Sequence, residues 1–291
     1  MGEEVTICLG ADEFLSEDAY INGLKFFSYG DDNTNISIKA ITFYMDGKKS
    51  KPDDFVAYTL EEEKEITIDG VASEEEEWSK AKEYEFTTKV ADAEGDNKTD
   101  TSATVRFMHD EDNVYFFVNV KDSNIDKSSA DNFRQDGLEI MFDEDCCGKT
   151  GSGGADWTEN PDAMHLRFTG LDKDSEEKTG LDAANHLCPG GGAEGKEKGE
   201  NVEIKYALTD DGYSIEAKIP FYEKKAVGDK VKIDLIIQDC KGGVRNNEIY
   251  LYNTEGAKSY WDNANADFGT LMLGKKTESE PEPEPEPEPQ E

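Results

Sequence analysis

Polar and aromatic side chains suited to sugar recognition fall on one side of several predicted strands. Around Glu139, the apolar residues Leu138 and Ile140 face the core, so Glu139 points to the opposite face. The same alternation in later runs turns further residues to that outer face: Arg167, Ile236, Gln238, Tyr250 and Tyr252. Carboxylate, guanidinium and amide groups hydrogen-bond hydroxyls, and aromatic rings stack on the apolar C–H faces of pyranoses. A sugar site fits this pattern, although on the pattern alone an ordinary solvated sheet face is the simpler explanation.

These positions depend on an all-β fold. Strand-like alternation recurs in short runs, separated by turn signals such as Asp211-Gly212 and Gly242-Gly243. The predicted strands are 103–108, 114–120, 137–143, 164–169, 202–208, 213–219, 231–238 and 248–252. The best helix candidate, 74–82, allows one or two turns at most. Short strands at this spacing predict an antiparallel β-sandwich, jelly-roll or immunoglobulin-like, with long Gly-rich loops between residues 144 and 200.

Composition divides the chain into three parts. Residues 1–63 are β-rich and end in Glu61-Glu62-Glu63. We interpret them as the end of a preceding module, with extra strands of the main sandwich as the alternative. Residues 64–275 form the predicted sandwich. Residues 276–291 form a Pro-Glu tail, in which proline blocks regular structure and the glutamates repel one another, so an extended spacer is expected.

The charge of the chain limits its partners. The net charge is −36, which disfavours nucleic-acid phosphates and anionic membranes because both repel it. No window approaches the ~20 apolar residues of a membrane span. Met1-Gly2-Glu3-Glu4 lacks the basic-then-apolar pattern of a secretory signal. Aromatic residues make up 10%, which is too many for a disordered acidic chain, so a buried core is expected.

The cysteines are odd in number, so at least one has no partner within the chain. They are Cys8, Cys146, Cys147, Cys188 and Cys240. A loop disulfide from Cys146 or Cys147 to Cys188 is favoured over free buried thiols. A zinc site formed by Cys146, Cys147, His186 and Cys188 is disfavoured, because structural zinc sites usually have two pairs of closely spaced ligands.

Seven sequence landmarks follow one another along 68–274. They are Ile68-Asp69-Gly70 with Trp78, Val114-Tyr115-Phe116-Phe117-Val118 leading into Val120-Lys121-Asp122, the run 134–143 with Gly137-Leu138-Glu139-Ile140, Met164-His165-Leu166-Arg167, the run 213–220, the run 234–239, and Trp261 followed by Phe268-Gly269-Thr270-Leu271. Because these landmarks occur in this order, the chain resembles the family 9 carbohydrate-binding modules, which are often attached to secreted xylanases. We expect a packing role for Trp78.

The resemblance implies a site that clamps a terminal sugar between two aromatic rings. Phe133 stands where the family usually has the first Trp, and Trp261 matches the second ring. Glu139 and Arg167 match the acid and the guanidinium that hydrogen-bond the sugar. Phenylalanine offers less stacking area than tryptophan, so weaker or altered selectivity is expected. The full set of expected ligand-binding residues is Phe133, Glu139, Arg167, Gln238, Tyr252 and Trp261, with no catalytic residue.

The resemblance also implies a role for the chain. It implies a non-catalytic module, extracellular or on the cell surface, that recognises xylan- or cellulose-type chain ends and targets a linked glycoside hydrolase. Family members can bind structural calcium, and the acidic triplets 110–112 and 143–145 offer oxygen ligands. Neither triplet has EF-hand spacing, so no metal residue is assigned.

Three alternatives stay open. A glycoside hydrolase needs two carboxylates ~5–9.5 Å apart, but Glu139 has no evident partner on its face. A haem-binding sandwich would use Met and His, yet His109 falls in a predicted turn and His165 points outward beside Met164, which leaves little for axial ligation. A cell-surface adhesion or scaffold protein would suit the Pro-Glu tail equally well.

Overall fold

The computed structural model describes residues 55–61, 64–91, 99–144, 163–187, 193–252 and 268–274. In these residues, thirteen strands form a continuous sheet. The strands are β1 Phe55–Thr59, β2 Glu83–Glu85, β3 Thr88–Ala91, β4 Ser102–His109, β5 Asn113–Lys121, β6 Gly137–Asp143, β7 Met164–Thr169, β8 Ala184–Leu187, β9 Glu203–Thr209, β10 Gly212–Pro220, β11 Lys230–Lys241, β12 Val244–Tyr250 and β13 Gly269–Leu273. The strands expected between residues 5 and 45 lie outside the described residues.

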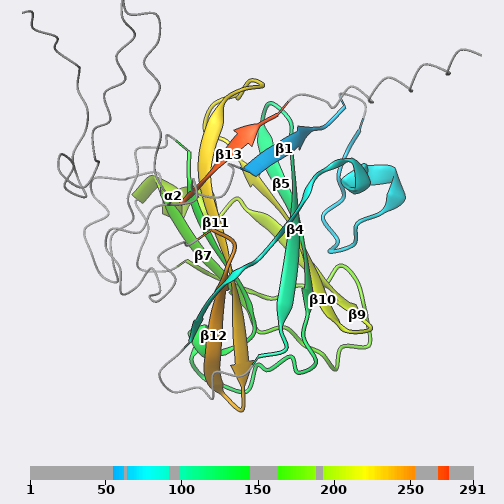
Figure 1. Ribbon diagram of the computed structural model, residues 1–291, viewed down its shortest axis with the longest axis vertical. Helices are drawn as coiled ribbons and strands as arrows, with labels where there is room; N and C mark the ends of the chain where they lie inside the picture. The colour runs from blue at the N-terminus through cyan, green and yellow to red at the C-terminus, as the bar shows by residue number, and fades with distance from the viewer. Residues whose placement is uncertain are drawn as a thin grey trace, which may run out of the picture. The chain divides into compact units, whose positions relative to one another are not determined.

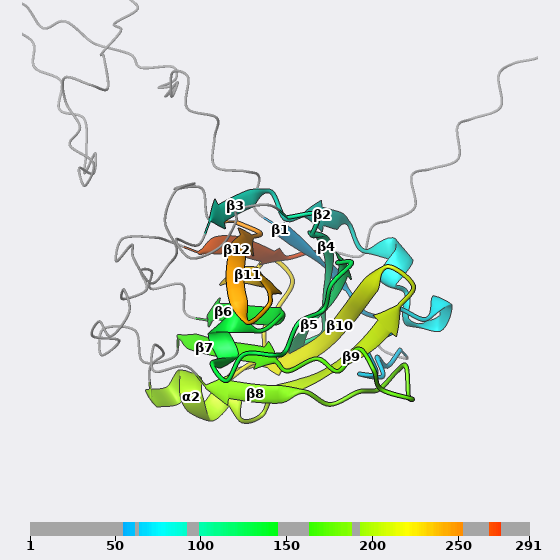
Figure 2. The ribbon, with the colours of Figure 1, turned by 90° about the horizontal axis from the view of Figure 1, so that it is seen from below.

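The sheet curls into two facing layers (Figures 1 and 2). One layer has the order β8-β7-β6-β11, with β12 beside β11 and β3 beside β12, and the other has the order β4-β5-β10-β9. Strand β1 joins them, because it pairs in parallel with β13 on one side and with β4 on the other. The remaining strand pairs are antiparallel. The predicted all-β sandwich is therefore confirmed, with two parallel pairings at β1.

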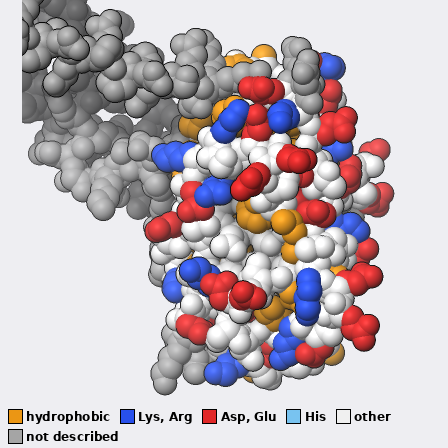
Figure 3. Space-filling view, turned by 90° about the vertical axis from the view of Figure 1, so that its right-hand side faces the viewer, with side chains coloured by type: hydrophobic (Ala, Val, Ile, Leu, Met, Phe, Trp, Pro, Cys, Tyr) orange, Lys and Arg blue, Asp and Glu red, His pale blue; other side chains and the backbone are white. Residues whose placement is uncertain are grey.

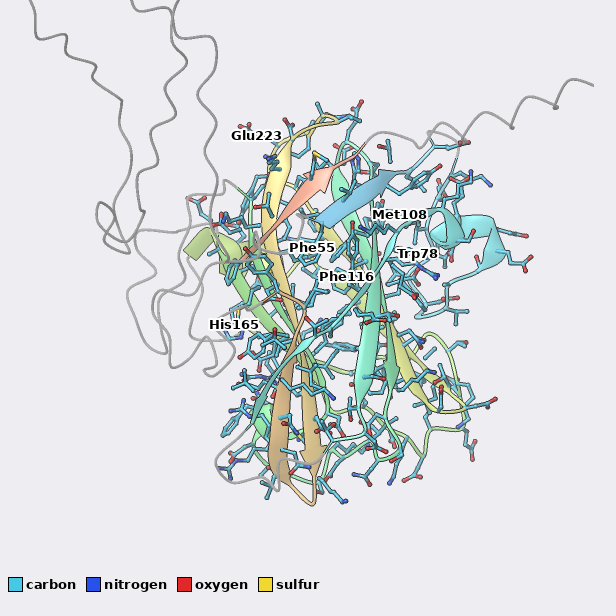
Figure 4. The ribbon with its side chains drawn as sticks, in the orientation of Figure 1. Phe55, Trp78, Met108, Phe116, His165 and Glu223 are labelled. Carbon is cyan, nitrogen blue, oxygen red and sulfur yellow. The ribbon has the colours of Figure 1, made fainter. Side chains whose placement is uncertain are left out.

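The inward residues of both layers form the main core. Alternate positions of β5, β6, β7, β10 and β11 are fully buried in one apolar cluster, including Phe116, Leu138 and Ile215. Figure 4 shows Phe55 and Phe116 between the layers, with Trp78 and His165 on opposite outer sides. Burial of apolar side chains on one face of each strand is the force that holds the layers together.

Short elements escaped the sequence analysis. Strands β2 and β3 have three and four residues, too few for alternation to be recognised. Strand β1 fell inside the 1–63 segment, yet Phe55–Thr59 belongs to the sandwich sheet. A helix, α2 (Ala193–Gly199), follows a Gly-rich stretch. It is fastened by the buried Lys198, whose Nζ bonds Glu144 and the Pro220 carbonyl oxygen. No described helix has the length and apolar character to span a bilayer.

The predicted helical segment 74–82 forms two 3₁₀ turns, Glu74–Glu76 and Trp78–Lys80. Trp78 is buried in a small cluster with Met108 and Tyr115 on the outer side of β4 and β5, which confirms its packing role. His109, expected in a turn, is instead the buried last residue of β4. The adjoining turn is closed by the Asp110 carboxylate, which accepts from the backbone amides of Asp112 and Asn113.

A buried carboxylate on β10 holds the segment from Asp69 to Trp78 against that strand. Glu216 accepts hydrogen bonds from the backbone amides of Asp69 (3.0 Å) and Gly70 (3.1 Å) and from Trp78 Nε1 (3.0 Å). Burial raises the pKa of Glu216 to about 7. Gly70 has φ +83°, and a Cβ there would lie 2.5 Å from the Tyr206 carbonyl carbon, so only glycine fits this approach.

Candidate functional site

The polar residues expected on one face do share it. Glu139 on β6 lies directly opposite Arg167 on β7 and Ile236 on β11. Gln238 lies two residues beyond Ile236, on the same face. Ile236 and Tyr250 are also on this outer face, where they are buried in a small apolar cluster with Met141. The outer face of this layer is therefore part polar network and part apolar patch.

Glu139 is the centre of the polar network. Its Oε1 accepts from Arg167 Nε (2.6 Å) and Gln238 Nε2 (2.8 Å), and its Oε2 lies 2.6 Å from His165 Nε2. Burial alone would raise the pKa of Glu139, but the Arg167 charge and the His165 hydrogen bond outweigh it and hold the pKa well below its usual range. The Glu139 side chain is 4% exposed and that of Arg167 is 13% exposed. Glu139 therefore lies deeper than Arg167 and orients its guanidinium group.

Arg167 connects the sheet to an exposed aromatic ring. Its Nη1 donates to Asn132 Oδ1 at 2.9 Å. Asn132 begins the 3₁₀ turn η3 (Asn132–Arg134), whose middle residue is Phe133. Phe133 is 36% exposed, one of few large apolar side chains so exposed among the described residues. An exposed ring and a guanidinium linked through Asn132 can contact the apolar face and the hydroxyls of one sugar.

A buried aspartate fixes the loop that carries Phe133. Asp136 Oδ1 accepts from the Cys240 backbone amide (2.7 Å), and Oδ2 accepts from the Asp126 amide (2.5 Å). Asp126 in turn accepts from the Gly243 amide (3.0 Å) in the β11–β12 turn. Burial and the nearby Asp122 raise the pKa of Asp136 well above its usual range. The loop is thus attached to the β11–β12 turn before Phe133, through Asp126, and to β11 after it, through Asp136.

Strand β12 adds two residues that sequence reasoning missed. Arg245 Nη1 donates to Glu248 Oε1 (2.8 Å) and to Gln238 Oε1 (3.4 Å). Glu248 shares the parity of Tyr250, a signal that could have found it, so the expectation that Glu139 has no second carboxylate on its face was wrong. Arg245 does not share this parity, because a bulge between Asp239 and Cys240 shifts the register and brings Arg245 to this face. Asn132 and His165 were missed as well, although His165 has the parity of Arg167.

Two expected site residues are not in this network. Tyr252 was expected on the outer face, and that prediction is wrong. It is 5% exposed and packs in the main core, with its ring centroid 6.1 Å from that of Phe55. Strand β12 ends at Tyr250, so the strict alternation no longer applies two residues later. Trp261 lies outside the described residues.

Only some of the residues considered for a metal site or a disulfide are among the described residues. No group of three His, Cys, Asp or Glu there gathers closely enough to hold a metal ion. Glu144 of the 143–145 triplet bonds Lys198 and lies 3.1 Å from Lys225 Nζ. Cys240 is a buried free thiol, and the other four cysteines lie outside the described residues.

The buried carboxyl groups of Glu216 and Glu248 should make the free energy of unfolding depend on pH. Burial raises the pKa of Glu248, like that of Glu216, to about 7 from a usual 4.5. The folded state then binds more protons than the unfolded state between pH 4.5 and 7, so stability is lost as pH rises through this range. We expect the free energy of unfolding to be roughly 2–4 kcal/mol higher at pH 5 than at pH 8. His186, whose pKa is lowered by burial and Arg167, works in the opposite direction.

Urea denaturation at pH 5, 6, 7 and 8 measures this dependence. In Glu216→Gln the slope should become shallower, because one of the two titrating carboxyls is gone. A free energy that rises steadily from pH 5 to 8 would contradict the prediction.

Comparison with known proteins gives the site its context. Two relatives are "Exoglucanase XynX" of Acetivibrio thermocellus, 23% identical over 269 residues, and "Endo-1,4-beta-xylanase C" of Paenibacillus barcinonensis, 25% identical over 212 residues. The alignments cover 92% and 72% of this chain but only 21% and 16% of those relatives. The chain therefore spans about a fifth of the length of the curated relatives it matches.

Solved structures share the fold. A carbohydrate binding module family 9 (CBM9) from Caldicellulosiruptor kristjanssonii, solved in complex with cellotriose, has a TM-score of 0.56 and 18% identity, covering 79% of this chain and 97% of that one. Its glucose complex gives a TM-score of 0.55. The model of the family described as "Carbohydrate family 9 binding domain-like" matches residues 68–276. This chain belongs to that family.

Proposed function

We propose that this chain is a non-catalytic carbohydrate-binding module that recognises the ends of xylan- or cellulose-type chains. The observation that carries the proposal is the Glu139-centred network, which links Arg167 through Asn132 to the turn that carries the exposed ring of Phe133. The likeness to modules solved with cellotriose and glucose supports it. The chemistry is suitable, because a planar donor group and an apolar ring complement the two kinds of surface on a sugar.

The residues divide into two roles. Phe133 is the proposed stacking ring, and Arg167 donates to sugar hydroxyls. Glu139 and Gln238 are 3% and 0% exposed, so they position the guanidinium rather than meet the sugar. Trp261 stays the proposed second ring. Tyr252 is removed from the set, since its ring belongs to the core.

A linked catalytic module fits the same proposal. Both relatives are named as polysaccharide-degrading enzymes that extend far beyond the matched region. Binding the polysaccharide would raise the effective concentration of substrate for a tethered enzyme. We place this work outside the cell or on its surface, where such polymers are found, with residues 276–291 as the extended spacer. Neither nucleic acid nor insertion into a membrane has a part in it.

Phe133→Ala tests the stacking role. We expect about tenfold weaker binding of cellotriose or xylotriose, because losing a stacked ring removes roughly 1.4 kcal/mol. Titration calorimetry with the full chain measures it. Tyr222→Ala is the matched control, since Tyr222 is 45% exposed on the β10–β11 connection, away from the network. Equal affinity of wild type and Phe133→Ala for both sugars would contradict the role of the ring.

A second candidate, glycoside hydrolase activity, rests on one observation. Glu248 lies on the face of Glu139, and the two pKa values are shifted in opposite directions, the pattern of an acid–base pair. Against it, both Glu248 oxygens are hydrogen-bonded, to Arg245 and to the Tyr250 hydroxyl (3.1 Å), and the residue is 7% exposed. Reducing-sugar release from xylan or cellulose that disappears in Glu248→Gln would establish the enzyme. We expect no release.

A further inference from the structure

The arginines of this chain are unusually placed. The chain has only four, Arg106, Arg134, Arg167 and Arg245. Three of them meet at one site, because Arg167 bonds Asn132 while the guanidinium groups of Arg134 and Arg245 lie close to the neighbouring Phe133 ring. Lysine supplies most of the positive charge elsewhere. An arginine differs from lysine in its planar fork of donors, which matches a carboxylate with two parallel hydrogen bonds.

The two guanidinium groups lie close to the exposed ring. The Arg134 guanidinium carbon is 5.2 Å from the Phe133 ring centroid, and that of Arg245 is 5.8 Å away. Both approaches are within the range of a cation–π contact. A sugar stacked on Phe133 would therefore have guanidinium groups beside it.

The negative charges of the site lie mostly deeper. The Glu139 and Glu248 side chains are 4% and 9% exposed, whereas those of Arg245 and Arg134 are 18% and 31% exposed. Among the described acids paired with these arginines, Asp131 is more exposed, at 55%, and its Oδ2 lies 3.9 Å from Arg134 Nη1. Exposed ion pairs of this length contribute little. The surface that a ligand meets around Phe133 is therefore richer in cations than the network below it.

We propose that the site prefers a sugar chain that carries a uronic acid, with its pyranose ring on Phe133 and its carboxylate facing Arg134 and Arg245. The inference rests on the proposed function and names its substrate class. A guanidinium has five N–H donors, and a carboxylate ligand would use two of them at a time. A neutral sugar would use donors and acceptors in comparable number, and it would gain little from a cluster of three arginines.

The charge of the whole chain narrows the ligand further. Acidic side chains are spread over the face seen in Figure 3, among lysines and arginines, and the net charge is −36. A polymer of uronic acids would be repelled along its length, while a single carboxylate within a Debye length of ~8 Å experiences mainly its immediate neighbours. The charge distribution therefore favours an isolated uronic acid branch on a neutral chain, such as a glucuronic acid on xylan, over a polyuronide.

Titration calorimetry of the full chain with three probes tests the inference. The probes are neutral xylotetraose, xylotriose bearing one methylglucuronic acid branch, and trigalacturonic acid. We expect the branched probe to bind about tenfold tighter than xylotetraose at low salt, corresponding to 1.4 kcal/mol, with the preference shrinking in 0.5 M NaCl. Arg134→Gln should reduce this preference to about twofold. Arg106→Gln, whose residue pairs with Glu83 on β2, should leave it unchanged.

The outcomes separate the two proposals. Equal affinity for the branched and neutral probes would overturn the uronic acid inference and leave the carbohydrate-binding proposal intact. Binding of none of the probes would overturn both. Tighter binding of trigalacturonic acid than of the branched probe would overturn the isolated branch in favour of a polyuronide. If Arg134→Gln melts at a lower temperature than wild type, Arg134→Lys, which keeps the charge and loses the fork, should still reduce the preference.

Discussion

Replacement of Glu139 by alanine should abolish measurable oligosaccharide binding and lower the free energy of unfolding by about 3–5 kcal/mol. The carboxylate is the shared acceptor of Arg167, His165 and Gln238. Removing it leaves a buried guanidinium edge and two further polar groups without their acceptor. Arg167 then loses the bond that orients it toward Asn132, so binding and stability fall together. Urea denaturation and titration calorimetry measure the two effects.

The matched control is Glu83→Ala. Glu83 also pairs with an arginine, Arg106, but its side chain is 48% exposed, so its loss should cost less than about 1 kcal/mol. Glu139→Gln keeps the shape and one acceptor oxygen and should keep part of the stability but little of the binding. If Glu139→Ala unfolds at the same urea concentration as Glu83→Ala, the network does not have the stabilising role assigned to it.

Replacement of Glu216 by alanine should lower the free energy of unfolding by about 3–5 kcal/mol without any change at the candidate site. Glu216 accepts from three buried donors, the amides of Asp69 and Gly70 and the Trp78 indole. Each donor left without an acceptor costs roughly 1–3 kcal/mol. The 3₁₀ turn that begins at Trp78 would then lose its attachment to β10. Urea denaturation at pH 5, with Trp fluorescence as the signal, measures the loss.

Glu203→Ala is the comparison for that experiment. Glu203 lies on the neighbouring strand β9 and bonds Lys218, but its side chain is 61% exposed, so little change is expected. A loss for Glu216→Ala as small as that for Glu203→Ala would show that water replaces the missing acceptor. It would also remove the reason for a buried acid at this position.

Much of the fold follows from alternation alone. The period of two that turns Leu138 and Ile140 inward also turns Glu139 outward, and the structure has all three as predicted. The same rule brought Arg167 and Gln238 to the face of Glu139 before any pairing was known. Antiparallel neighbours with matching parity place such residues together, so most of the network could be predicted from one simple regularity.

The misses come from places where that regularity ends. Tyr252 lies two residues beyond the last residue of β12, so the parity that held at Tyr250 no longer applies. A bulge separates Arg245 from the later residues of β12 and reverses its parity relative to Glu248 and Tyr250. Strand β1 pairs with β13, more than two hundred residues away, and nothing local in the sequence could indicate that partner.

The parallel pairing of β1 with β13 has a mechanical consequence. These are the first and last strands of the described sandwich, and they run side by side in the same direction, with Phe55 opposite Leu271 and Ala57 opposite Leu273. Tension applied through the chain before β1 and after β13 would slide the two strands in opposite senses. Their hydrogen bonds would then be loaded together in shear instead of opening one at a time like a zipper. If the sandwich were pulled from both ends of the chain, the β1–β13 pair would bear the force first and resist it in shear.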